Sequence, residues 1–178
     1  MRPTIEQLRA LPDWASRYRW NLIFNSFPSG VSSSFATPSH ERLNFQCVSA
    51  GLPKKAGGTF PISLRGWTLI NPGIWVTSGT IILTFIETVD NLVLNFLQGW
   101  HEAAWAMATG QAATKKDLTA NIILNRLDRF DSIIRQYRMD AIIADYDPGG
   151  DLDDASTDTR PTITLAYDSF TEETATGF

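Results

Sequence analysis

The sequence of 178 residues contains one cysteine, two histidines and no long run of apolar residues. A lone Cys47 excludes an intrachain disulfide and suits a reducing compartment, and we expect its thiol to be buried like a small apolar side chain. No stretch approaches the roughly 20 apolar residues of a membrane-spanning helix, and the N-terminal MRPTIEQLRALPDW lacks the pattern of a secretory signal. We therefore expect no membrane anchor, and a protein that is used in the cytosol or leaves by a route other than secretion.

The chain also lacks an excess of positive charge. Fifteen Lys and Arg residues stand against 19 Asp and Glu residues, which gives a formal net charge of −4. This balance argues against a surface that grips phosphate backbones. Aromatic residues are abundant instead, with six Trp and ten Phe. We expect a single folded domain over residues 1–178, with some of the aromatic rings at interfaces.

The scarcity of histidine limits the metal chemistry available to the chain. The segment GWHEAAWAM, residues 99–107, begins like the HExxH motif of zinc proteases, with His101 and Glu102 in place. Trp105 occupies the position of the second histidine, and only His40 remains elsewhere. Because zinc needs several converging ligands, we predict no metal site here. His101 and Glu102 are interpreted as the solvated or partner-facing edge of a packing helix.

No other motif indicates catalysis or a cofactor. The acidic turn DYDPGGDLDDASTD, residues 145–158, has Ser156 where an EF-hand loop needs its last acidic ligand, and Pro148 stiffens it. The serines of residues 29–34 and Ser39 approach His40 only in sequence, and neither a GxSxG motif nor a phosphate-binding glycine motif is present. We expect a solvated turn, no catalytic residues and no cofactor.

Alternation of apolar and polar residues predicts that most of the chain forms β-strands. In residues 16–27, Trp20, Leu22 and Phe24 occupy every second position. A strand is also predicted over residues 42–50, where Asn44 and Gln46 would face away from the apolar side. Further strands are predicted over residues 79–88, 119–128, 132–146 and 160–170.

One amphipathic helix is predicted over residues 90–107. Asp90 or Thr88 can cap its first turn, and Gly110 can close its end. Its apolar residues recur at steps of three and four and would form one stripe against a sheet: Val93, Phe96, Leu97, Trp100, Ala104 and Met107. These elements together predict a mainly β, α+β fold, a small antiparallel β-barrel or sandwich flanked by one α-helix.

The segment of residues 51–79, GLPKKAGGTFPISLRGWTLINPGIWVTSG, combines Gly and Pro with large apolar side chains. A surface loop of this length and apolarity is a liability for a monomer. Two interpretations stay open. Either the segment is an additional hairpin folded back over the core, or it is a long extended arm that docks on another subunit.

In their order and spacing, these elements resemble the tail tube proteins of contractile-tailed bacteriophages, relatives of the type VI secretion tube protein. The resemblance spans roughly residues 17–170, with FQCVSAGLP ending the second strand and FPISLRGW opening the arm. In IILTFIETVDNLVLNFLQGWHEAAWAM a strand leads directly into the helix, and IIRQYRMDAIIADYDPGG precedes a final ITLAYDSF. The DLDDASTD turn and the residues after Phe170 depart from the compact ending that this family would have.

The resemblance implies a small antiparallel β-barrel whose copies form hexameric rings, which stack into a hollow tube through which DNA passes. It implies as partners the tail sheath, tape measure, baseplate and tail terminator proteins, in a virion tail assembled in the bacterial host cytoplasm. It also implies that the arm, from about Gly51 to Trp75, contacts an adjacent subunit or the next ring. Large apolar side chains dominate such interfaces, and the expected interface residues are Phe60, Leu64, Trp67, Ile70, Ile74 and Trp75.

The mechanism that the resemblance implies is mechanical and electrostatic. Six copies at −4 each carry a formal charge of about −24, and a lumen of that sign would repel phosphates and let DNA slide. The expected lumen-facing residues lie on the polar faces of the predicted strands: Asn44, Gln46, Asn121, Asn125, Gln136, Asp140, Thr162 and Thr164. Arg138 shares a face with Gln136 and Asp140, so the wall need not be uniformly acidic.

Two alternative functions stay open beside the phage tail tube. A subunit of a type VI-like secretion tube, or of a headless contractile injection system, would share the same sequence features. A monomeric β-barrel that holds a small ligand belongs to a different class. It predicts a single species in solution, whereas a tube subunit predicts rings or filaments that grow with concentration.

Overall fold

The computed structural model describes residues 17–31, 38–105, 110, 113–150 and 158–174. They form a six-stranded antiparallel sheet in the order β1-β6-β7-β8-β5-β2 and a separate two-stranded hairpin, β3-β4. The strands of the sheet are β1 (Trp20–Ser26), β2 (Cys47–Ala50), β5 (Gly79–Phe85), β6 (Ala120–Leu127), β7 (Ile133–Asp147) and β8 (Thr162–Thr174).

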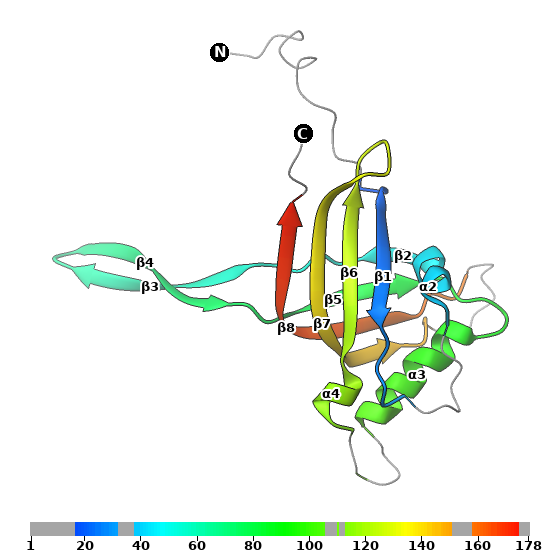
Figure 1. Ribbon diagram of the computed structural model, residues 1–178. Helices are drawn as coiled ribbons and strands as arrows, with labels where there is room; N and C mark the ends of the chain where they lie inside the picture. The colour runs from blue at the N-terminus through cyan, green and yellow to red at the C-terminus, as the bar shows by residue number, and fades with distance from the viewer. Residues whose placement is uncertain (1–16, 32–37, 106–109, 111–112, 151–157, 175–178) are drawn as a thin grey trace.

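The sheet curls because β7 and β8 belong to two parts of it. The first half of β7 pairs with β6, whereas its second half pairs with the part of β8 that also pairs with β5. The β7–β8 register shifts between Met139 and Ala141 and again between Ile143 and Asp145, and such irregularities increase local twist. Figure 1 shows the upright strands turning into the layer of β5 and β2. This half-barrel confirms the predicted antiparallel β fold.

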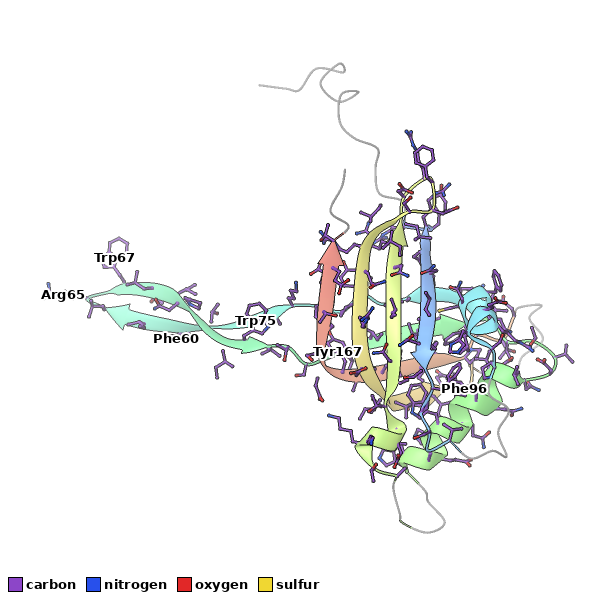
Figure 2. The ribbon with its side chains drawn as sticks, viewed as in Figure 1. Phe60, Arg65, Trp67, Trp75, Phe96 and Tyr167 are labelled. Carbon is purple, nitrogen blue, oxygen red and sulfur yellow. The ribbon has the colours of Figure 1, made fainter. Side chains whose placement is uncertain are left out.

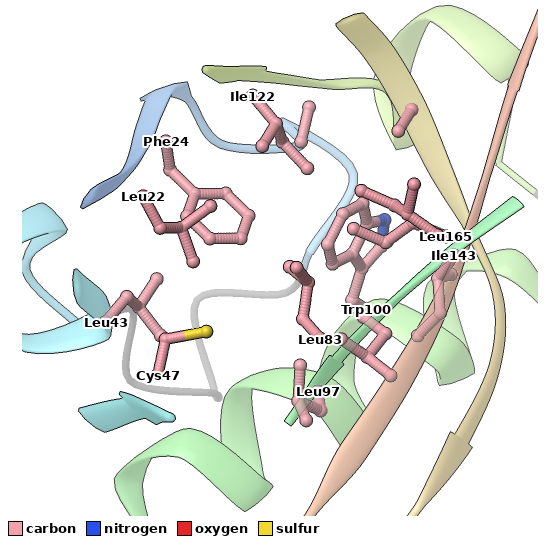
Figure 3. Close-up of a cluster of buried hydrophobic side chains, with 14 of the residues drawn as sticks. Leu22, Phe24, Leu43, Cys47, Leu83, Leu97, Trp100, Ile122, Ile143 and Leu165 are labelled. Atoms are coloured by element: carbon pink, nitrogen blue, oxygen red, sulfur yellow. The ribbon is translucent and has the colours of Figure 1, made fainter. Parts of the chain in front are cut away.

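Helix α3 (Leu92–Ala104) covers one side of the core, as its apolar stripe predicts. Val93, Phe96, Leu97, Trp100 and Ala104 are all buried, and Met107 lies outside the described residues. Figure 3 shows Leu97 and Trp100 beside core residues of the sheet that include Leu83, Ile143 and Leu165. The Trp100 Nε1 donates a hydrogen bond of 2.9 Å to the carbonyl oxygen of Leu118, at the end of the short helix α4 (Lys115–Leu118).

The predicted caps of this helix are wrong. The backbone N–H of Leu94 donates to the Glu87 carboxylate at 2.5 Å, so Glu87 supplies the negative charge at the helix start. The Asp90 carboxylate instead accepts two hydrogen bonds of 2.7 Å from the Arg42 guanidinium. The helix ends at Ala104, well before Gly110.

The predicted strand over residues 42–50 is wrong in its first half. His40–Gln46 form helix α2, and β2 covers only Cys47–Ala50. The Ser39 Oγ accepts a hydrogen bond of 3.2 Å from the backbone N–H of Arg42 and so caps α2. Leu43 is buried while Phe45 is 82% exposed, so the two do not share a face. Cys47, which follows, is buried as expected, and burial raises the pKa of its thiol to about 12.

We expect Trp100→Ala to lower the free energy of unfolding by about 3–5 kcal/mol, because it leaves a large cavity and an unpaired Leu118 carbonyl. Trp105, just beyond the end of the same helix, is 47% exposed and serves as the matched control. Trp105→Ala should change the free energy of unfolding by less than about 1 kcal/mol. Urea denaturation followed by circular dichroism measures both, and equal losses in the two variants would contradict the assigned packing.

Candidate assembly surfaces

Residues 51–79 form a hairpin arm that projects from the sheet, so the interpretation of a hairpin folded over the core is wrong (Figure 1). The arm consists of β3 (Ala56–Leu64) and β4 (Trp67–Val76), paired antiparallel. Arg65 and Gly66 connect them with positive φ angles of 49° and 84°. Positive φ at both positions is the geometry of a type I′ turn, whose twist matches that of the flanking strands.

The pairing register gives the arm one strongly apolar face. Leu64 lies opposite Trp67, and Ile62 lies opposite Leu69. Opposed residues share a face and faces alternate along a strand. We call this set the apolar arm face: Phe60, Ile62, Leu64, Trp67 and Leu69. Its side chains are 46% to 77% exposed, and a contiguous exposed apolar surface marks an interaction site.

The six expected interface residues are all exposed, but they do not share one face. Phe60, Leu64 and Trp67 belong to the apolar arm face, whereas Ile70 lies on the opposite face, paired with Pro61. Ile74 and Trp75 lie beyond a register shift between Gly57 and Thr59, nearer the base of the arm (Figure 2). Their contact with another subunit stays a prediction.

Three side chains of β8 hold the base of the arm, and we call them the arm clamp: Tyr167, Phe170 and Glu172. The Tyr167 hydroxyl accepts a hydrogen bond of 3.1 Å from the backbone N–H of Lys54. A Cβ atom at Gly79 would lie 2.6 Å from the same hydroxyl oxygen, so a larger residue there would displace the Tyr167 side chain. Figure 2 shows Tyr167 where the arm meets the sheet. Both ends of the arm are therefore fixed to one residue.

The other two clamp residues bind Lys55, the next residue along the arm. The Lys55 ammonium lies 5.7 Å from the centre of the Phe170 ring and pairs with the Glu172 carboxylate. Arg135 of β7 pairs with the second oxygen of Glu172 at 2.9 Å. These contacts fix the direction of the arm in the single copy, and a fixed direction would lower the entropy lost if the arm bound another chain.

The second surface is the side of β6, β7 and β8 that faces away from the core, which we call the polar sheet face. It carries six of the expected lumen-facing residues: Asn121, Asn125, Gln136, Asp140, Thr162 and Thr164. Asn121 lies opposite Asp140, and Asn125 lies opposite Gln136. Thr162 and Thr164 alternate with the buried Ile163 and Leu165 of β8.

A ladder of amide side chains crosses the polar sheet face. Gln136 donates to Asn125 at 2.9 Å, and Asn125 donates in turn to Asn21 of β1 at 2.9 Å. Asn121 donates to the Asp140 carboxylate at 2.6 Å. Asn125 is only 2% exposed, and these bonds satisfy its amide there. The amides bind one another, which leaves fewer of them to hold a molecule passing over the surface.

Asn44 and Gln46 do not join the polar sheet face, so the predicted strand on which their assignment to the lumen rested is wrong. Both lie on α2, and they were assigned to the lumen because residues 42–50 were predicted to form a strand. The Asn44 Oδ1 accepts a hydrogen bond of 2.8 Å from the backbone N–H of Leu22, on the outer edge of β1. The Gln46 Nε2 donates to the carbonyl oxygen of Ile86 at 3.1 Å. Both amides serve the fold of a single copy.

Parts of the sheet edge lack a strand partner within the described part of the chain. β1 is one end of the sheet and pairs only with β6. The last residues of β8, from Phe170 to Thr174, pair with β7 on one side and with no strand on the other. Unpaired edges of this kind are templates for pairing with another chain.

The residues considered for chemistry have structural roles. His101 contacts the rings of Trp105 and Tyr146 at centroid distances of 4.8 and 5.1 Å, and His40 stacks on Phe27 at 4.5 Å. In the acidic turn, the Asp147 carboxylate accepts backbone hydrogen bonds from Gly149 and Gly150, whereas Ser156 lies outside the described residues.

Two further features are absent from the part of the chain that the structure describes. No group of three or more His, Cys, Asp and Glu side chains there could hold a metal ion. Among the helices within those residues, none is long and apolar enough to cross a membrane.

Comparison with known proteins identifies the fold. No family model and no curated protein sequence matches the chain. The tube-terminating cap of the anti-feeding prophage matches with a TM-score of 0.64 and 15% identity, over 93% of this chain and 95% of that chain. The chain has the fold of contractile-injection tube proteins. At this identity the likeness concerns the fold alone.

Two further structures share this tube-protein fold. A chain of the sheath–tube complex of an extracellular contractile injection system, PVC, matches with a TM-score of 0.60 and 12% identity, over 98% of this chain and 100% of that chain. The sheath/tube terminator of PVC matches with a TM-score of 0.63 and 12% identity, over 92% and 99% of the two chains. The predicted likeness to tube proteins is confirmed at the level of fold.

Sequence reasoning about this tube-protein fold missed the arm clamp. Tyr167 and Lys54 are 113 positions apart, and Glu172 and Lys55 are 117 apart, so no local pattern connects them. One usable signal was present. After the alternating Ile163 and Leu165, the sequence continues with Tyr167, Phe170 and Glu172. A strand that continues past its apolar run can hold another segment of the chain.

We expect Glu172→Gln to weaken the acid sensitivity of the fold. The hydrogen bond from Lys55, followed by the charges of Lys55 and Arg135, holds the pKa of Glu172 below its ordinary value. A lowered folded-state pKa stabilises the fold above the unfolded pKa of about 4.3, and this stability is lost as the pH falls through the folded-state pKa. Between about pH 5 and pH 3, wild-type protein should therefore lose more unfolding free energy than Glu172→Gln.

Urea denaturation at a series of pH values measures this difference. Glu173→Gln is the control, because Glu173 makes no ion pair with the described residues. Its pH slope should match that of the wild type. Identical slopes for all three proteins would rule out the clamp carboxylate as the source.

Proposed function

We propose that this chain is a structural subunit of the inner tube of a contractile bacteriophage tail, with no catalytic step. In this proposal all 178 residues belong to one tail-tube domain, and rings of six copies stack into a hollow tube. The observation that carries the proposal is the arm. It presents large apolar side chains to water in a fixed direction, and a second copy of the chain would bury them.

Ring closure would use the edges of the sheet. The outer edge of β1 and the free edge at the end of β8 are on different strands, so pairing one with the other joins neighbouring copies head to tail. A head-to-tail contact repeated by a rotation closes into a ring and covers these two edges. In such a ring the polar sheet face forms the inner wall.

The wall of the channel would bind DNA only weakly, for two reasons. Its amides already bind one another, and the copies share a net charge of −4 each, which disfavours adhesion of phosphates. Arg138 stands on the same face as Asp140, so the wall carries both signs of charge and less repulsion than the total of about −24 for six copies suggests. DNA passing through the tube would therefore meet no specific binding site.

The proposed partners follow from a position inside a contractile tail. Sheath and terminator partners are supported by the matched structures, whose descriptions name a sheath–tube complex and a tube terminator. Baseplate and tape measure proteins would meet the tube at its end and in its lumen. The proposed location is the virion tail, assembled in the host cytoplasm.

The matched structures also favour a second candidate in the same class. They belong to the anti-feeding prophage and to an extracellular contractile injection system, so the chain would also suit a headless injection device, a type VI-like tube or a tube-terminating cap. A monomeric ligand-binding barrel is less well supported. Such a barrel needs a hollow interior, whereas Leu83, Trp100 and Leu165 fill the inside of this sheet (Figure 3).

We expect Trp67→Ala and Trp75→Ala to impair polymerisation more than folding. Both indoles are mostly exposed in the single copy, at 77% and 69%, so their removal leaves no cavity. Loss of a buried interface Trp costs about 2 kcal/mol or more. The concentration needed for assembly should then rise about 30-fold. Negative-stain electron microscopy and sedimentation of purified protein measure assembly, and urea denaturation measures folding.

Thr68→Ala is the matched control, because Thr68 is next to Trp67 but lies on the other face of the arm, opposite Ser63. It should assemble at the wild-type concentration. Tubes of normal length from both Trp variants would count against the arm as the interface. A wild-type chain that stays monomeric at high concentration would count against the tube itself.

A further inference from the structure

A cleft opens between the two strands that end the sheet, β1 and β2. One wall is the start of β1 with the end of β6, and the other is β2 with the residues that follow it. The cleft has a volume of ≈ 680 Å³. A second depression adjoins it and shares Arg17, Trp20 and Val48 with it. We call the two together the edge cleft.

The edge cleft is basic and partly apolar. Its main depression is lined by four cationic residues and by no acidic residue. Arg19 pairs with Asp131, but Arg17, Lys54 and Arg126 make no ion pair with the described part of the chain. Trp20 and Leu52 supply apolar surface beside these charges. In a chain of net charge −4, this concentration of unpaired positive charge predicts an acidic occupant with some apolar side chains.

We infer that the edge cleft receives the acidic turn, residues 145–158, of a second copy of this chain. The turn contains six Asp residues and neither Lys nor Arg, and Tyr146, Pro148 and Leu152 give it apolar side chains. Asp145 and Asp147 are exposed and make no ion pair with the described residues, whereas Asp158 pairs with Arg160. Each surface thus carries the charge that the other lacks. This inference rests on the proposed assembly of copies and names one of its contacts.

The position of the two surfaces favours contact between copies rather than within one. Ile133, at the start of β7, lies opposite Leu127, the residue after the cleft residue Arg126. Asp147 lies at the other end of this 15-residue strand, which has a contour length of about 50 Å. The β6 wall of the cleft is therefore far from the turn along β7, whereas the β2 wall is nearer, because Ser49, Thr84, Thr162 and Asp147 lie opposite one another in successive strands. No described residue of the turn lines the cleft, so the two surfaces are separate in the single copy and a contact between copies is head to tail.

Two other segments of the chain fit the edge cleft less well. The arm, residues 56–76, has Arg65 as its sole charged residue, which would add positive charge to a basic cleft. Residues 1–16 contain two Arg and two acidic residues, so they bring no net charge to neutralise. Of these three segments, only the acidic turn combines strong negative charge with apolar side chains.

A charge-swap experiment tests this contact. Arg17→Glu/Lys54→Glu/Arg126→Glu leaves only Arg19 against three Glu and makes the cleft acidic. Asp145→Lys/Asp151→Lys/Asp153→Lys/Asp154→Lys leaves two Asp against four Lys and makes the turn basic. Each variant alone should need at least about tenfold more protein to assemble, because like charges then meet at every contact. Mixed in equal amounts, the two variants should assemble near the wild-type concentration. The acidic cleft of one accepts the basic turn of the other, and the remaining contact is the native pairing of basic cleft and acidic turn.

Controls separate this contact from general charge effects and from misfolding. Lys116→Glu reverses one charge on α4 outside the cleft and is matched to Arg126→Glu alone. We expect Arg126→Glu, and not Lys116→Glu, to raise the assembly concentration. Equal effects of the two would overturn the inference. So would restoration in a single chain carrying all seven reversals without restoration in the mixture, because that result indicates a contact within one copy. Urea denaturation confirms that each variant is folded.

A peptide titration keeps the inference separate from the tube proposal. A fluorescent peptide of residues 145–158 should bind the wild-type chain, measured by anisotropy, and bind Lys54→Glu/Arg126→Glu at least about tenfold more weakly. A peptide of the same composition in scrambled order reports purely non-specific attraction. Peptide binding by a chain that forms no tubes would overturn the tube and leave the cleft assignment standing. Tubes from a chain that does not bind the peptide, or that binds both peptides equally, would overturn the cleft assignment and leave the tube proposal standing.

Discussion

The continuous pairing of β7 with β8 is the contact on which the other features of this molecule depend. It runs from Arg135–Thr174 to Asp147–Thr162, and its two register shifts bend the sheet without breaking it. One half of the pair extends β6 and β1, and the other half carries β5 and β2. The bend encloses the core, leaves the polar sheet face on the outside and opens the edge cleft between β1 and β2.

Strand β8 shows how one segment of sequence serves three surfaces. Ile163 and Leu165 point into the core, and Thr162 and Thr164 alternate with them on the polar sheet face. Tyr167, which is itself buried in the core, and then Phe170 and Glu172 hold the arm. A change of register in β8 would move all three sets at once, because side chains alternate across a strand. The assembly surfaces are therefore positioned by the same hydrogen bonds that build the core.

Local periodicity predicted most of the strands and the main helix, but few of the contacts between residues that are distant in sequence. The predicted strands over residues 79–88, 119–128, 132–146 and 160–170 and the stripe of α3 follow from repeating apolar positions, which is where burial acts residue by residue. The predicted strand over residues 42–50 was wrong in its first half because Leu43 and Cys47 are spaced four apart, which suits a helical turn as well as a strand. The Ser39 cap then favours the helix. The predicted Asp90 cap failed because Arg42, distant in sequence, engages Asp90, and Glu87 accepts from the helix start in its place.

The candidate surfaces were predictable to different degrees for the same reason. Exposed apolar residues in a Gly- and Pro-rich segment are visible in the sequence, and so is the alternation that places Asn121, Asn125 and Gln136 on one face. The edge cleft is not visible, because Arg17, Lys54 and Arg126 come together only when β1, β2 and β6 take their places in the sheet. Charge complementarity between distant segments is a property of the folded chain.

Because the two strands of the arm pair with each other, the length of the arm can change without a change in the rest of the fold. Such changes in length would give proposed tubes of different diameter and pitch. β3 and β4 pair with each other and with no strand of the body, and the arm meets the body only at its base. Inserting two residues into each strand keeps the turn, the alternation and the clamp, and moves the tip outward by about 7 Å. In the proposed tube, the spacing between subunits would change in small steps with the length of the arm, and the core would stay the same.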